Sequence, residues 1–196
     1  MNKNHLALAF VLVFSLVLAA CEFNGGVEQG RCVAYDEANR TVTVVVDTAI
    51  DQHNPHYSGK VDTFKLPEKD IDMGPAPIAG DLLMVETDKK QILYYNQADK
   101  KIETMPVTII SEEKGVTAKS LGSRTFPEIN EQDRAITVYS ARLGELITFR
   151  PDAEDAFNLP KSTWALGDEV RIAYRNDTRA QAIRFMNVSK TNIFTR

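Results

Sequence analysis

The 196-residue chain has little of the chemistry that marks an enzyme or a metal protein: two Cys, three His and one Trp. It has no Gly-x-Ser-x-Gly, phosphate-binding loop, dinucleotide fingerprint, His-Glu-x-x-His or Cys-x-x-Cys motif, so the common hydrolases, nucleotide enzymes and redox proteins are not indicated. Its 23 Lys and Arg are outnumbered by 27 Asp and Glu, without a basic block that could neutralise nucleic-acid phosphates. We therefore predict no catalysis, no cofactor and no nucleic-acid partner.

The strongest positive signal lies at the N-terminus. A polar start that includes Lys3 precedes an apolar stretch from Leu6 to Leu18, which is interrupted by Ser15 and followed by two alanines. A basic start, about 7 to 15 apolar residues and small residues at a cleavage point are typical of a secretory signal peptide. A transmembrane helix needs about 20 apolar residues, more than this stretch offers. We predict that residues 1–20 are a signal peptide.

The end of the signal resembles the lipobox of bacterial lipoproteins, with the sequence Leu18-Ala19-Ala20-Cys21. The resemblance implies cleavage before Cys21, diacylglycerol on its thiol and a further acyl chain, such as palmitate, on the new amine. Several chains anchor a protein stably in a membrane, which one chain does not. Glu22, in place of the Asp that favours inner-membrane retention, implies the outer membrane, with the protein facing the periplasm of the cell envelope.

The rest of the chain has the pattern of an all-β protein. Residues 21–30 are polar and Gly-containing, and we predict a short tether. In Arg40-Thr-Val-Thr-Val-Val-Val-Asp47, β-branched residues alternate with a period of two, which is typical of a half-buried strand. Similar short segments follow at residues 62–66, 80–85 and 91–96, and no helical periodicity of ten or more residues is present outside the signal.

The order of these strand signals repeats at offsets of 87 to 94 residues. The matching landmarks are Arg31 with Arg124, Arg40 with Arg134, Asp62-Thr-Phe-Lys-Leu-Pro67 with Asp155-Ala-Phe-Asn-Leu-Pro160, Gly80-Asp81 with Gly167-Asp168, and Gln91-Ile-Leu-Tyr-Tyr-Asn96 with Ala182-Ile-Arg-Phe-Met-Asn187. We predict two tandem duplicated β modules, residues 28–110 and 121–196, joined by a linker at 111–120. Five short strands in each suit a small OB-like or SH3-like barrel. Such small modules are marginal alone, so the copies would pack together or share strands.

Several polar residues are candidates for a site. His53 and His56 lie three apart in one loop and could form part of a metal shell, although no third ligand follows at a fixed spacing and solvated histidines are common in polar loops. Asp81 and Asp168 recur after Gly at strand starts, where Asp usually bonds to a turn amide. Cys32, left without an intrachain partner by acylation of Cys21, is expected to be buried as a small apolar residue.

These features favour a membrane-anchored envelope lipoprotein that acts as a structural or protein-interaction module of an envelope complex. Its partners would be the membrane, through the lipid on Cys21, and an envelope protein. The alternative is a lipoprotein that binds a small ligand or metal, through the His53/His56 loop or the groove between the two copies. The whole chain is also similar to lipoproteins of sulfate-reducing bacteria, a resemblance that implies location and no chemistry.

Overall fold

The computed structural model describes residues 24–49 and 54–191. This part contains eleven strands in two antiparallel sheets, together with one single-turn α-helix, α2 (Ala118–Leu121), and four short 3₁₀ helices. The predicted all-β class is confirmed. Within the described residues, no helix has the length and apolar character needed to cross a membrane.

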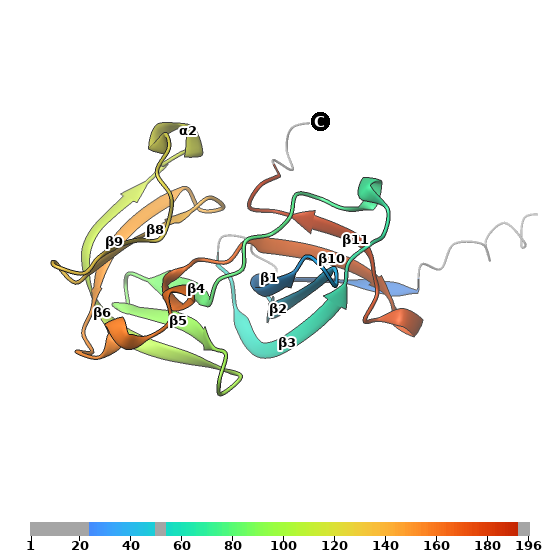
Figure 1. Ribbon diagram of the computed structural model, residues 1–196, viewed down its shortest axis with the longest axis horizontal. Helices are drawn as coiled ribbons and strands as arrows, with labels where there is room; N and C mark the ends of the chain where they lie inside the picture. The colour runs from blue at the N-terminus through green and yellow to red at the C-terminus, as the bar shows by residue number, and fades with distance from the viewer. Residues whose placement is uncertain (1–23, 50–53, 192–196) are drawn as a thin grey trace, which may run out of the picture.

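Two lobes, one for each sheet, lie side by side (Figure 1). The five-stranded lobe has the order β11-β10-β1-β2-β3, with β1 (Gly25–Asp36), β2 (Thr41–Asp47), β3 (Tyr57–Lys65), β10 (Glu169–Arg175) and β11 (Ala182–Asn187). The six-stranded lobe has the order β4-β5-β6-β9-β8-β7, with β4 (Leu82–Glu86), β5 (Gln91–Asn96), β6 (Lys101–Lys114), β7 (Glu128–Asn130), β8 (Ala135–Ser140) and β9 (Glu145–Pro151). The 3₁₀ helices are η1 (Asp70–Asp72), η2 (Ala156–Asn158), η3 (Lys161–Trp164) and η4 (Asn176–Thr178).

The sheets do not follow the two halves of the sequence. The chain forms β1 to β3 in one lobe, β4 to β9 in the other, and returns to the first lobe for β10 and β11. The predicted arrangement of two tandem barrel modules, residues 28–110 and 121–196, is therefore not confirmed, because each sheet takes strands from both halves. Their boundaries also differ: β1 begins at Gly25, within the predicted tether, where it pairs with Arg175, and β6 extends to Lys114, within the predicted linker.

The two connections between the lobes run against each other in close backbone contact. The amide of Asp168 donates to the carbonyl of Ile78 at 2.8 Å, and the amide of Leu82 donates to the carbonyl of Ala165 at 3.0 Å. A Cβ atom on Gly80 would lie 2.1 Å from the oxygen of Ala165, so this crossing requires glycine. The repeated Gly-Asp pairs of the sequence thus mark the points where the chain changes lobe.

Three clusters of buried side chains hold the fold together. One fills each lobe, and Trp164 belongs to the cluster of the six-stranded lobe. The third cluster joins the lobes and contains Val33, Val45, Tyr57, Leu83 and Tyr95. In β2 the alternation explains this double role, because Val42 and Val44 face the interior of the five-stranded lobe while Val45 faces the other lobe. The lobes therefore share an apolar interface.

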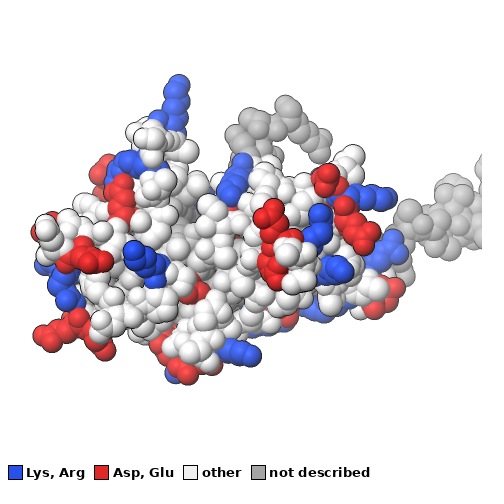
Figure 2. All heavy atoms as spheres, viewed as in Figure 1, with Lys and Arg blue, Asp and Glu red and all other residues white. Residues whose placement is uncertain are grey.

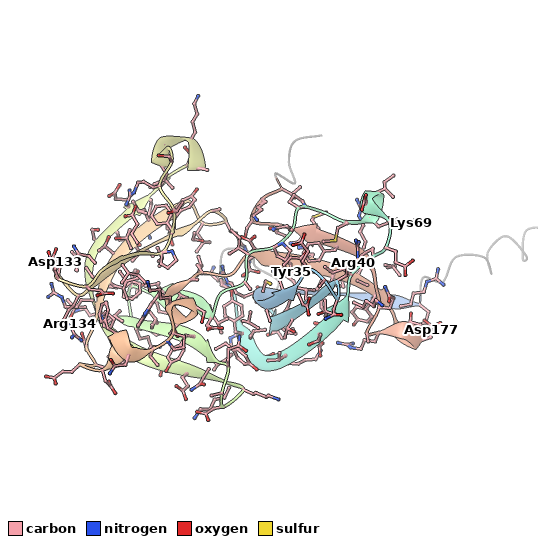
Figure 3. All side chains as sticks on the ribbon, in the orientation of Figure 1. Tyr35, Arg40, Lys69, Asp133, Arg134 and Asp177 are labelled. Atoms are coloured by element: carbon pink, nitrogen blue, oxygen red, sulfur yellow. The ribbon has the colours of Figure 1, made fainter. Side chains whose placement is uncertain are left out.

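Two turns at matched sequence positions have the same conformation. Arg40 and Arg134 each end a four-residue turn with positive φ, 50° and 51°. The Arg40 guanidinium donates to the carbonyl of Pro67, and that of Arg134 donates to the carbonyl of Glu154 at 2.8 Å. Figure 3 shows Arg134 at the outer end of the six-stranded lobe and Arg40 in the other lobe. Each Arg thus ties a hairpin turn to the segment that follows the second strand after it, β3 in one lobe and β9 in the other.

The visible surface carries both signs of charge. Lys and Arg side chains are interspersed with Asp and Glu on both lobes, and uncharged atoms dominate where the lobes meet (Figure 2). A large basic surface is not present on this face, in keeping with the net charge of −4.

Candidate functional site

A cluster of buried charges lies where the five-stranded lobe meets the six-stranded lobe. Glu169, at the start of β10, is fully buried. Its Oε1 is 3.1 Å from Nη2 of Arg31 and accepts a 2.6 Å hydrogen bond from the Tyr57 hydroxyl. Arg31 also donates from Nε to the Tyr57 oxygen at 3.1 Å and from Nη1 to the carbonyl of Gly167 at 2.9 Å. Three strands of one lobe thus converge on one carboxylate.

The six-stranded lobe contributes Arg142 to this cluster. Arg142 lies in the turn between β8 and β9, and its side chain is 8 % exposed. Its Nη1 is 3.0 Å from Oε2 of Glu169 and 3.9 Å from Oδ2 of Asp47. The two groups are in charge contact without an aligned hydrogen bond, since the guanidinium nitrogens of Arg142 and Oε2 of Glu169 have no hydrogen-bond partner in the structure. Arg142 therefore links the lobes mainly through charge.

This cluster is suited to holding the lobes rather than to acid–base chemistry. Burial raises the pKa of Tyr57 far above its usual range, with Glu169 adding to the effect. Burial acts to lower the pKa of Arg31, but Tyr57 and Glu169 outweigh it, and the pKa is raised. Neither group changes its protonation near neutral pH, as a general acid or base must.

A cleft of about 570 Å³ opens beside the cluster, between the lobes. Its walls come from β8, from the residues that precede β7, from the crossing connections and from the turn after β11. Arg31 lies at its base and belongs to both the cleft and the buried cluster. Pockets of about 300–1,000 Å³ that combine apolar walls with a few polar groups are the usual form of small-molecule sites.

The cleft lies next to the open edge of the six-stranded sheet. An inner strand has a partner on both sides, as β1 of the five-stranded lobe does with β2 and β10. In the six-stranded lobe, the described pairing of β7 is with β8 alone, over three residue pairs. Residues 124–127, which lead into β7, border the cleft instead of continuing a ladder.

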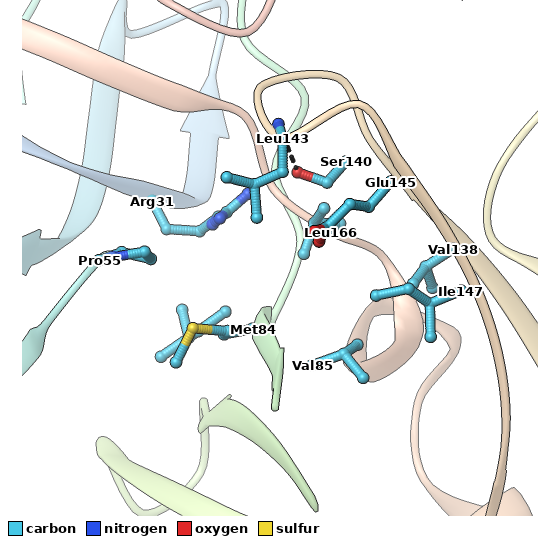
Figure 4. Close-up of a pocket in the computed structure, with 11 residues that line it drawn as sticks. Arg31, Pro55, Met84, Val85, Val138, Ser140, Leu143, Glu145, Ile147 and Leu166 are labelled. Carbon is cyan, nitrogen blue, oxygen red and sulfur yellow. Dashed lines mark hydrogen bonds between the residues drawn. The ribbon is translucent and has the colours of Figure 1, made fainter. Parts of the chain in front are cut away.

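A second, much smaller cavity of about 30 Å³ adjoins the cleft. It shares Arg31, Val138, Ser140 and Leu166 with the cleft, and side chains from both lobes converge on it (Figure 4). The Ser140 hydroxyl accepts the amide of Leu143 at 3.3 Å and so fixes the turn that carries Arg142. The volume has room for about one or two water molecules.

The structure does not test the predicted metal pair. His53 lies outside the described residues, as does Cys21. The backbone amide of His56 donates to Oδ1 of Asp47 at 2.7 Å. Among residues 24–49 and 54–191, no group of three or more His, Cys, Asp or Glu side chains has the geometry to hold a metal ion. Metal binding by the His53/His56 loop stays a prediction.

The paired aspartates of the Gly-Asp landmarks have structural partners. Oδ2 of Asp168 accepts from the amide of Ile78 and from Nδ2 of Asn187, both at 2.8 Å. Oδ1 of Asp81 accepts from Nε2 of Gln97 at 2.7 Å. Each carboxylate therefore braces a connection between the lobes.

Cys32 is a buried thiol in β1, and burial raises its pKa to about 12. We expect an aromatic disulfide reagent at pH 8 to leave it unmodified in the folded mature chain carrying Cys21→Ser, and to label one thiol per chain after unfolding in urea. Rapid labelling of the native protein would contradict this. Because the folded pKa exceeds the unfolded value of 9.0, the stability gained from burying the neutral thiol is present below pH 9 and lost as the pH rises toward 12.

The buried charge cluster and its link to the cleft were not predicted from the sequence. Arg31 is a landmark of the repeat, whereas Tyr57 and Arg142 carry no local signal. They come from distant strands, and the pairing of strands across the halves brings them together. A charged residue directly before the alternating run of β10, as Glu169 is, was the one available sign.

Comparison with known proteins identifies the family of the chain but gives no related protein of known function. No curated protein and no solved structure matches it. A family model, described as a domain of unknown function (DUF4881), matches residues 23–196 and so covers most of the sequence and all of the described part. The chain therefore belongs to the DUF4881 family.

Proposed function

We propose that this protein is a lipid-anchored module of the bacterial cell envelope that binds a small ligand in the cleft between its lobes. The observation that carries the proposal is the cleft of about 570 Å³, which is lined by residues of both lobes and has Arg31 at its base. No catalytic set accompanies it among the described residues, so binding is the function that this geometry supports best.

The lipid anchor is proposed from the lipobox, and the short segment between Cys21 and the first strand is compatible with it. With β1 beginning at Gly25, four residues after Cys21, the body would lie within about 14 Å of an acylated Cys21. The outer membrane, with the body in the periplasm, is the proposed location. We expect the wild-type protein from membranes to begin at Cys21 and to carry the mass of the acyl chains, and Cys21→Ser to carry no lipid mass. A wild-type protein without added mass would contradict the anchor.

We further propose that the body arose by duplication of a five-strand unit, β1 to β5 and β7 to β11, with exchange of the last two strands. Two matched pairs support this proposal: the turns at Arg40 and Arg134, whose guanidinium groups each donate to a carbonyl beyond the following hairpin, and the crossings at Gly80 and Gly167. The five-stranded sheet also curls toward a small barrel, because Lys65 at the end of β3 bridges to Gln181 before β11. Each lobe would then be an OB-like or SH3-like module of mixed origin.

Ligand binding can be tested by filling the cleft. Ala118 is an exposed residue of α2 that lines the cleft, and Ala38 is an exposed residue of the β1–β2 turn outside it. The protein purified from its own envelope is extracted with organic solvent and analysed by mass spectrometry. We expect a compound that is retained by the wild type and by Ala38→Trp, and lost from Ala118→Trp. The same extract from all three proteins would contradict the proposal.

A protein partner is the second candidate, favoured by a groove that is lined by residues of β6, β7, β8 and β9. The groove measures about 500 Å³ and is bordered by Ile110, Ile129 and Thr148. Ile110 is half exposed because β6 changes register between Ile109 and Ser111. An edge strand beside an exposed apolar residue is a surface on which another chain can add a strand. Crosslinking from position 110 in intact envelopes would capture such a partner.

A further inference from the structure

On the basis of the proposed binding function, we infer that the cleft takes an amphipathic anion, a small molecule with an apolar body and one carboxylate or phosphate group. The volume of about 570 Å³ lies within the range of about 300–1,000 Å³ that is usual for small-molecule sites. The cleft is therefore large enough for a fatty acid or an aromatic acid, and too small for a folded partner.

The apolar part of the cleft is partly open to solvent. Ile78, on the connection from η1 to β4, is 55 % exposed and is one of four large apolar residues exposed in the described part. Phe126 and Tyr139 stand with ring centroids 5.9 Å apart. The Tyr139 hydroxyl is directed to the carbonyl of Val116 at 3.3 Å. A bound hydrocarbon chain or ring would cover Ile78, Phe126 and Leu166, which gains about 25 cal/mol for each Å² of apolar surface removed from water.

The charged side chains that line the cleft are mostly positive. Three are cations, Arg31, Arg124 and Lys190, and one is an anion, Asp168. The Asp168 carboxylate already has donors from Ile78 and Asn187, and Lys190 lies 3.3 Å away. The counter-ions of the two arginines, Glu169 and Glu128, are not part of the cleft lining. A ligand would therefore meet cations in a protein that is acidic overall.

The two outer cations are available to a ligand. Arg124 forms a two-pronged contact with Glu128, at 2.9 and 2.7 Å, but both side chains are 42 % exposed. Exposed pairs contribute about 0–1 kcal/mol, so exchanging Glu128 for a ligand anion costs little. Lys190 is exposed, donates to the carbonyl of Ala76 at 2.8 Å and lies 3.3 Å from Asp168, so one of its three N–H groups remains for a ligand. Arg124 belongs to the six-stranded lobe and Lys190 to the turn after β11, so an anion held between them would bridge the lobes.

The test uses two fluorescent probes with nearly the same aromatic body, anilinonaphthalene sulfonate, which is anionic, and N-phenylnaphthylamine, which is neutral. Each is titrated into the mature chain with Cys21→Ser, which contains every described residue. The charge variant is Arg124→Gln/Lys190→Gln. Its matched control is Arg175→Gln/Lys101→Gln, two exposed cations outside the cleft. The third variant, Ala118→Trp, fills the cleft. Circular dichroism verifies the fold of each variant.

We expect one anionic probe to bind per chain, at least about tenfold more tightly than the neutral probe, since each hydrogen bond to a charged group contributes about 1.5–3 kcal/mol. The charge variant should lose about tenfold in affinity for the anionic probe and less than about twofold for the neutral one, with the control unchanged. Displacement by laurate or by dodecyl phosphate then distinguishes a carboxylate from a phosphate ligand.

Equal affinity for both probes, or an unaffected charge variant, overturns the anion preference while the binding function stands. If neither probe binds, or if Ala118→Trp changes nothing, the binding function fails as well.

Discussion

Replacing Glu169 by Ala is expected to lower the free energy of unfolding by about 3 to 5 kcal/mol, because it leaves the buried cations Arg31 and Arg142 without their shared carboxylate. The Tyr57 hydroxyl would lose its acceptor as well. This loss is a large part of the about 5–15 kcal/mol that stabilises a typical domain. Urea denaturation followed by fluorescence of the single Trp measures it. The control is Glu131→Ala, at an exposed turn, which should cost less than about 0.5 kcal/mol.

A double-mutant cycle separates the contact between lobes from the rest of the cluster. Arg142→Met and Glu169→Gln each remove one charge of the 3.0 Å pair. The double variant is expected to be more stable than the sum of the single effects predicts, by about 1–3 kcal/mol, because each single variant already loses the contact between Arg142 and Glu169. Additive effects would show that Arg142 is stabilised by Asp47 and solvent instead of by Glu169.

Gly167→Ala is expected to destabilise the fold by about 3 kcal/mol or more. The new Cβ would lie 2.1 Å from the carbonyl oxygen of Cys32, in backbone that cannot move without opening the contact between the lobes. The same reasoning applies to Gly80→Ala, which would meet Ala165. Unfolding in urea measures both variants.

The control for these variants is Gly59→Ala. Gly59 has a φ of +81° and no atom within 4 Å of its added Cβ, so the substitution carries backbone strain of about 1–2 kcal/mol and no collision. If Gly167→Ala costs no more than Gly59→Ala, the close backbone approach at the crossing is not a constraint, and the lobes have room to adjust.

Local patterns predicted the strands and left their partners open. The alternation in β2 correctly predicted that Val42 and Val44 face a core, because period-two burial depends on neighbouring residues alone. The prediction that Cys32 is buried as a small apolar residue was likewise confirmed. Which strands share a sheet depends on contacts between residues more than 100 positions apart, such as Arg31 with Glu169, and no local pattern encodes them.

The cleft and the charge cluster escaped prediction for the same reason. A groove between the two copies was one predicted site, but the predicted boundary between the copies lay between residues 110 and 121. In the structure, the boundary lies along the crossing connections, and the groove takes residues from both halves of the chain. The Gly-Asp repeats were recognised correctly as landmarks, and the backbone collision that a side chain would cause explains why glycine stands there.

Because the chain passes from one lobe to the other and back, the two lobes cannot be separated by dividing the sequence at one point. A fragment ending at Gly115 would lack β10 and β11 of one sheet and β7 to β9 of the other, so neither lobe could be transferred to another protein on its own. A protease that cuts between β6 and β7 would release nothing, because the two pieces remain paired through β1 with β10 and through β6 with β9. Such a nicked molecule would elute as one species in size-exclusion chromatography, and its two pieces would separate only on unfolding.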